Sequence, residues 1–197
     1  MRGGIARRFG LLTIGLLIAA APARLALAQE VPTTEAMLGG LSGLEAPSDL
    51  EIPALRQKAA ERLKSRTDLN PLKRPPLVPQ LNRLPHVNVD IQFNPDSPII
   101  RPQSYRTIAR IADVLTNPAL MGSTFLIVGR TDANGGRRDN NLTLSQRRAE
   151  SVRDALVTTF KVSAKRLVAL GLGEEQLLDA DHPKAAVNLQ SMIVTLR

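Results

Sequence analysis

The most constraining feature of the sequence is an apolar run that leads through a polar loop into a long amphipathic segment. Residues 124–128 are almost entirely apolar, which is typical of a central strand covered on both faces. We expect a helix from about Leu144 to Phe160, with Thr143 and Gln146 forming a capping box at its start. Such a strand–loop–helix unit places a carboxylate, here Asp132, at the end of the strand and backbone N–H groups at the helix mouth. The loop is therefore a candidate site for a small charged group.

The segments around this unit predict an α/β fold. Apolar and polar residues alternate from 86 to 93, which predicts a half-buried strand. Pro102 opens a predicted helix that ends at Asn117-Pro118. Further strands are predicted at 165–170 and 190–196. The order is βαβαββ, which predicts a two-layer α/β sandwich over residues 86–197.

Helical geometry selects Arg148 within the second predicted helix. Arg148 shares a stripe with Leu144, Val152 and Ala155, whereas Arg147 lies on the polar side. Because helical side chains lean toward the N-terminus, the Arg148 guanidinium reaches the helix mouth beside the Asp132 loop. A cation there opposes the helix dipole by about 0.3–1 kcal/mol, so we expect a compensating partner. The spacing leaves two interpretations open: an internal Asp132–Arg148 salt bridge, or joint binding of a ligand with one anionic and one cationic group.

The first 28 residues have the three-part form of a secretory signal peptide. A basic start precedes an apolar stretch, and Ala26-Leu27-Ala28 forms a small-x-small cleavage site. Only 15 residues separate Arg8 from Arg24, fewer than the roughly 20 that span a bilayer. We therefore expect cleavage after Ala28, rather than a retained anchor, and a periplasmic location associated with the cell wall or the outer membrane.

The composition of residues 29–85 predicts a proline-rich, largely extended linker. They hold eight of the fourteen prolines, with one short helix predicted at about 49–66. The segment lacks strand alternation and is too short for a membrane β-barrel. Two interpretations remain open: a tether, or an arm that docks an envelope protein through its helix.

Composition excludes several classes of function. The chain has no cysteine, so disulfides, thiolate sites and a lipid-modified cysteine are excluded. With only His86 and His182, we expect no metal, no cofactor and no enzymatic activity. The net charge of +8 falls to +4 once the four leader arginines are removed, and aromatic residues make up only 3%. We therefore do not expect nucleic acid as a partner. A nucleic-acid binder is the third hypothesis, and it predicts binding to DNA that depends steeply on salt.

From Asp90 to the C-terminus, the chain resembles the OmpA-like peptidoglycan-binding domain family, to which OmpA, Pal and MotB belong. The family pattern is G-x-T-D, a glycine turn, then N-x-x-L-S-x-x-R-A-x-x-V, and later G-x-G-E. The matching residues here are Gly129, Thr131, Asp132, Asn141, Leu144, Ser145, Arg148, Ala149, Val152, Gly171, Gly173 and Glu174. The resemblance implies a βαβαββ fold and binding to the diaminopimelate of peptidoglycan stem peptides. The resemblance implies that Asp132 and Arg148 bind the diaminopimelate, and that Thr131 and Asn141 shape the loop or add contacts.

The chain departs from the family pattern at two places. The loop between Asp132 and Arg148 is one residue longer, and the family's N-R-R-V reads Asn188-Leu189-Gln190-Ser191, so both arginines are missing. The leading hypothesis is a non-catalytic peptidoglycan-binding protein that anchors or tethers an envelope component. The alternative is an envelope scaffold with the same fold that has weakened or lost wall binding.

Overall fold

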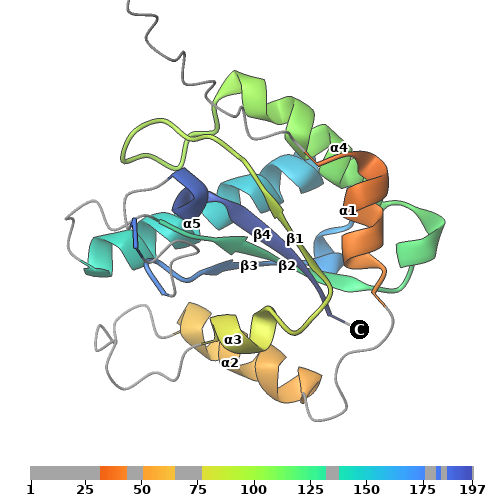
Figure 1. Cartoon of the computed structure of the whole chain (residues 1–197), viewed down its shortest axis with the longest axis horizontal. Coiled ribbons are helices and arrows are strands. Elements are labelled where there is room, and N and C mark those ends of the chain that lie inside the picture. The colour runs from red at the N-terminus through yellow and green to blue at the C-terminus, as the bar shows by residue number, and fades with distance from the viewer. Residues whose placement is uncertain are drawn as a thin grey trace, which may run out of the picture.

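A four-stranded sheet in the order β1-β4-β2-β3 forms the centre of the computed structural model (Figure 1). The strands are β1 (His86–Val89), β2 (Thr124–Gly129), β3 (Leu167–Gly171) and β4 (Ser191–Leu196). β4 lies antiparallel between β1 and β2, and β3 runs parallel to β2 at the other edge. The structure describes residues 32–43, 51–64, 77–131, 138–175, 181–182 and 186–196, and so excludes the predicted leader and Asp132. The helices are α1 (Thr34–Leu41), α2 (Ile52–Lys64), α3 (Val78–Leu81), α4 (Tyr105–Leu115) and α5 (Arg138–Thr158).

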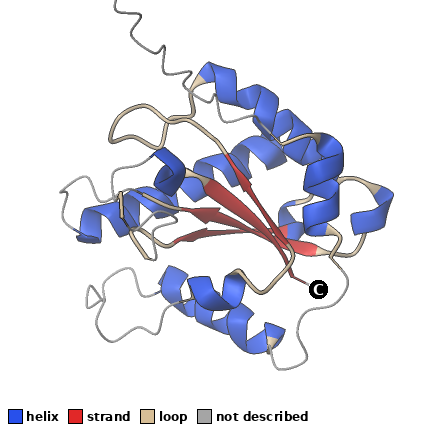
Figure 2. Ribbon diagram, in the orientation of Figure 1, coloured by secondary structure: helices blue, strands red, loops and turns tan. Residues whose placement is uncertain are grey.

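The strands carry two apolar faces, each covered by helices. Phe125, Ile127 and Ile193 belong to one buried cluster, which α1, α4 and α5 cover. Leu126 and Val194 belong to a second cluster on the opposite face, where α2 and α3 pack. Figures 1 and 2 show α1, α4 and α5 on one side of the sheet and α2 and α3 on the other. The α/β fold with the order βαβαββ is confirmed, and the arm adds helices to both faces.

The described part of residues 29–85, which we call the arm, contains more helix than the sequence predicted. One short helix in a largely extended segment was expected between residues 29 and 85, but the described part contains α1, α2 and α3. Gly39 and Gly40 lower the helix propensity of residues 34–41, and for this reason the sequence did not predict α1. Its burial compensates, because Met37 and Leu41 are each 1% exposed and Thr195 Oγ1 donates to the Leu41 carbonyl at 2.9 Å.

The predicted start of the second long helix is wrong. α5 begins at Arg138, so Thr143 lies inside the helix and Gln146 forms no capping box there. The Gln146 side chain instead accepts a hydrogen bond from Gly171 N at 2.6 Å. Residues 139–141 are Asp and Asn, which favour caps and turns in isolation. Asn141 contacts Glu174 in the segment after β3, and such tertiary contacts outweigh local propensity.

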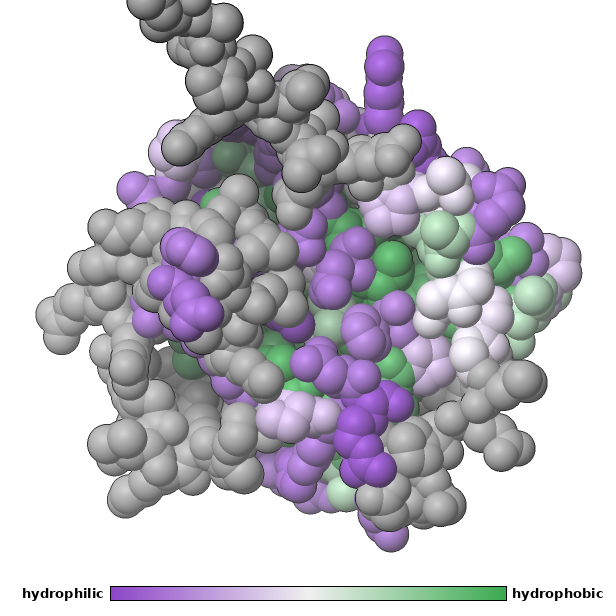
Figure 3. All heavy atoms as spheres, in the orientation of Figure 1, coloured by the Kyte–Doolittle hydropathy of each residue, from purple (hydrophilic) through white to green (hydrophobic). Residues whose placement is uncertain are grey.

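The face of the molecule seen in Figure 3 carries both polar and apolar side chains. In Figure 3, purple hydrophilic side chains lie across the visible face, with green hydrophobic ones between them. Within the described ranges, none of the helices has the length and apolar character needed to cross a membrane.

Candidate functional site

The candidate site lies where α5 crosses the carboxyl ends of β2 and β3. Gly129 and Gly171 end these strands, and a Cβ at either position would collide with the backbone of Ser145 or Gln146. The helix backbone therefore rests directly on the strand ends. Ser145 is fully buried there, and its Oγ accepts a hydrogen bond from Gly173 N at 2.8 Å.

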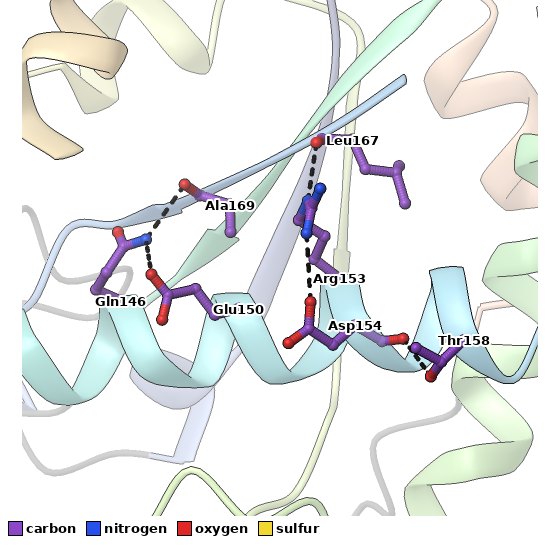
Figure 4. A network of polar contacts seen from close by, with 7 residues as sticks. All are labelled: Gln146, Glu150, Arg153, Asp154, Thr158, Leu167 and Ala169. Carbon is purple, nitrogen blue, oxygen red and sulfur yellow. Dashed lines mark hydrogen bonds and ion pairs between the residues drawn. The ribbon is translucent and has the colours of Figure 1, made fainter. Parts of the chain in front are cut away.

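Side chains of α5 fasten the helix to β3 on both sides of Arg148. Gln146 donates to the Ala169 carbonyl at 3.4 Å, and Arg153 donates to the Leu167 carbonyl at 3.0 Å (Figure 4). Arg153 also forms an ion pair with Asp154 at 3.3 Å, which contributes little because both groups are substantially exposed. The backbone that carries Arg148 is thus held against the sheet.

The prediction that the Arg148 guanidinium reaches the helix mouth is wrong, because α5 begins ten residues earlier, at Arg138; the side chain extends instead toward the segment between β1 and α4. Its Nε donates to the Ser97 carbonyl at 3.1 Å, and its guanidinium lies 5.0 Å from the centre of the Phe93 ring. Arg148 is half-buried, whereas Arg147 is exposed, as helical geometry predicted. The hydrogen bond and the cation–π contact together restrict the orientation of a positive group. Such a group matches a carboxylate in two-point geometry.

Thr131 and Asn141 contact a different part of the structure from Arg148. Thr131 is 2% exposed, and its backbone N donates to the Gly173 carbonyl at 3.0 Å. Asn141 Nδ2 donates to the Glu174 carboxylate, so this side chain braces the segment that follows β3. Arg148 lies two helical turns beyond Asn141, a rise of about 10 Å. Asp132 follows Thr131 directly but lies outside the described residues.

One buried polar atom of this group lacks a partner in the described part of the chain. Thr131 Oγ1 is shielded from solvent and makes no hydrogen bond there. A buried hydroxyl without a partner carries a desolvation cost of about 1–3 kcal/mol. A ligand or the adjoining loop that supplies an acceptor would remove this cost.

Sequence reasoning missed the residues that hold Arg148 in place. Phe93 was expected only as a strand residue, and Ser97 contributes a backbone carbonyl that any residue type supplies. Glu175 was also missed: its carboxylate accepts from Leu77 N and Val78 N at the start of α3. These contacts join residues up to 98 positions apart, so local spacing carries no signal for them.

Comparisons with known proteins find similarity over about half of the chain. Residues 92–189 match the model of the OmpA family. Over 98 residues the chain is 33% identical to outer membrane porin F of Pseudomonas aeruginosa, covering 50% of this chain and 27% of that protein. Over 84 residues it is 36% identical to the probable lipoprotein YiaD of Escherichia coli, covering 43% of this chain and 36% of that protein. The chain therefore spans about a third or less of the length of these curated relatives.

Among solved structures, the peptidoglycan-associated lipoprotein from Burkholderia pseudomallei is similar, with a TM-score of 0.45 and 31% sequence identity. The match covers 53% of this chain and 87% of that one.

Proposed function

The chain belongs to the OmpA family through residues 92–189, and on this premise we propose that it is a non-catalytic periplasmic protein that binds peptidoglycan. Binding would anchor or tether an envelope component to the cell wall. One relative is named an outer membrane porin and another a probable lipoprotein, which supports an envelope location.

The observation that carries the proposal is the anchored guanidinium of Arg148. Because Ser97 and Phe93 already restrict this side chain, little conformational entropy is lost when it binds a ligand. Diaminopimelate offers a carboxylate and an ammonium on one short side chain. In our proposal Arg148 pairs with the carboxylate, and Asp132 accepts hydrogen bonds from the ammonium.

Thr131 and Asn141 have supporting roles in this proposal. Asn141 keeps the first turns of α5 against Glu174, and Thr131 fixes the chain directly before Asp132 through its bond to Gly173. In this proposal both residues support the loop, and the Thr131 hydroxyl, which has no partner among the described residues, would accept or donate one further hydrogen bond.

The arm of residues 29–85 would connect the wall-bound domain to an envelope protein. Leu55 of α2 is buried against the sheet, while Gln57, Lys58 and Glu61 are exposed on the same helix. Because Leu55 docks α2 on the sheet, α2 is not part of a free tether, and its exposed polar face is the surface that it offers to a partner in this proposal.

A second candidate function is an envelope scaffold with weak or no wall binding. The change of the family's two arginines to Leu189 and Gln190 favours it, because both positions are half-buried here and neither supplies a charge. The two candidate functions differ in one prediction: only the peptidoglycan-binding protein needs Asp132 and Arg148 to be retained on the cell wall.

Retention on purified sacculi tests the proposal. We expect the mature protein to co-sediment with sacculi, and Asp132→Ala or Arg148→Ala to reduce the bound fraction at least about 10-fold, since each change removes a charge-assisted hydrogen bond. Arg147→Ala is the matched control, because it removes the same charge from the exposed neighbouring position. Equal retention of the wild type and both site variants would reject peptidoglycan recognition at this site and favour the scaffold.

A further inference from the structure

Arg130 is a buried cation at the end of β2 to which the proposed function gives no role. Its side chain is 3% exposed, and its Nη2 donates to Met192 Sδ at 3.5 Å. A thioether sulfur is a weak acceptor. Nε and Nη1 are buried and have no hydrogen-bond partner among the described residues. Burial lowers the pKa of Arg130 from its ordinary value, but an arginine stays charged at neutral pH.

The strand register places Arg130 on the face opposite Arg148. β2 and β4 pair Val128 with Met192, and continuing that register brings Arg130 opposite Gln190. Met192 and Val128 both belong to the apolar cluster beneath α2 and α3. Arg148 contacts Phe93, which packs against the other cluster. The sheet therefore separates the two arginines, and Arg130 is not part of the Arg148 site.

A second unsatisfied polar atom lies on the other side of Met192. Asn88 is paired with Met192 across β1 and β4, and its Oδ1 is buried without a partner in the described part of the chain. β1 and β2 are two strand spacings apart, or about 10 Å, so Asn88 does not neutralise Arg130 directly. The α2/α3 face thus holds buried donors on Arg130 and a buried acceptor on Asn88, which lie about two residues apart along β4 as well as on different strands.

An unpaired buried guanidinium costs several kcal/mol, whereas a carboxylate provides charge-assisted hydrogen bonds to it. A monocarboxylate also costs less to desolvate than a phosphate dianion, because the cost rises steeply with charge. We propose that Arg130 is the centre of a binding site for a small monocarboxylate at the carboxyl edge of the α2/α3 face. This site stands independently of peptidoglycan binding.

Thermal unfolding of the mature protein in acetate and in chloride, at equal pH and ionic strength, tests the site. The wild type should show a saturable rise in Tm of about 3 °C with acetate, because the anion binds the folded state. Arg130→Met should show no such rise, and in chloride it should be at least as stable as the wild type, because methionine suits the apolar neighbours.

Arg166→Met is the matched control. Arg166 donates from Nε to the Ser123 carbonyl at 2.9 Å and from Nη2 to the Leu120 carbonyl at 2.7 Å. This variant should be less stable in both salts yet keep the acetate-dependent rise. An equal rise in the wild type and in Arg130→Met would overturn the proposal, as would a rise with phosphate but none with acetate.

A second readout needs no variant. The Nε–H resonance of Arg130 in the wild-type NMR spectrum should shift saturably as acetate is added, with the same midpoint as the change in Tm. An Arg130 resonance that does not move with acetate would also overturn the site.

Discussion

Replacing Gly171 with alanine should lower the free energy of unfolding by about 3 kcal/mol, at the upper end of the cost of overpacking. A Cβ at this position would collide with the N and Cα atoms of Gln146 and the Ser145 hydroxyl. Most of these atoms are helix backbone, which Gln146 and Arg153 fasten to β3, so α5 cannot move away without breaking those bonds. Urea denaturation followed by circular dichroism measures the change.

Gly39→Ala provides the matched control for that prediction. Gly39 lies inside α1, and a Cβ there would meet no atom within 4 Å. Alanine should therefore stabilise the protein by about 0.5–1 kcal/mol, through the higher helix propensity alone. If Gly171→Ala unfolds at the same urea concentration as the wild type, α5 does not rest on the strand ends as described.

Truncating Leu81 to alanine should cost about 3 kcal/mol, as expected for a fully buried leucine. Leu81 lies in α3 and packs in the cluster that includes Leu126, Val128 and Val194 of the sheet. The cost arises only if the arm is a structural layer of the domain, because a leucine in a free tether contributes almost nothing. Chemical denaturation of the full mature chain measures it.

Ile99→Ala is the comparison for Leu81→Ala, since Ile99 is 62% exposed. We expect it to change the unfolding free energy by no more than about 0.5 kcal/mol. A Leu81→Ala variant as stable as Ile99→Ala would show that α3 does not dock on the sheet in solution.

The elements with strong periodicity were predictable from the sequence. The apolar run of β2 and the i, i+3, i+4 spacing of Ile108, Ile111 and Ala112 in α4 each identify an element within a few residues. α1 and the first turns of α5 were not predictable, because Gly39, Gly40 and the Asp/Asn residues at 139–141 oppose helix formation locally. Burial against the sheet and contacts with the segment after β3 outweigh those preferences.

Within the candidate site, the sequence predicted only those features that the helix period determines. The half-buried position of Arg148 follows from the helix period, and the exposure of Arg147 follows from the same argument. The contact of Arg148 with Phe93 depends on how the segment after β1 packs on α5, and the contact of Arg130 with Met192 depends on the β2–β4 register. Neither contact can be predicted from the spacing of residues along the sequence.

Binding of two stem tripeptides that differ only in the third residue tests the role of Arg148 most directly. One carries meso-diaminopimelate and the other lysine, which lacks the side-chain carboxylate but keeps the ammonium. Isothermal titration should show the wild type binding the diaminopimelate peptide at least about 10-fold more tightly, from one charge-assisted hydrogen-bonded pair. In Arg148→Ala this preference should disappear, while Arg147→Ala should keep it. Equal affinity of the wild type for both peptides, or an unchanged preference in Arg148→Ala, would contradict carboxylate recognition by Arg148.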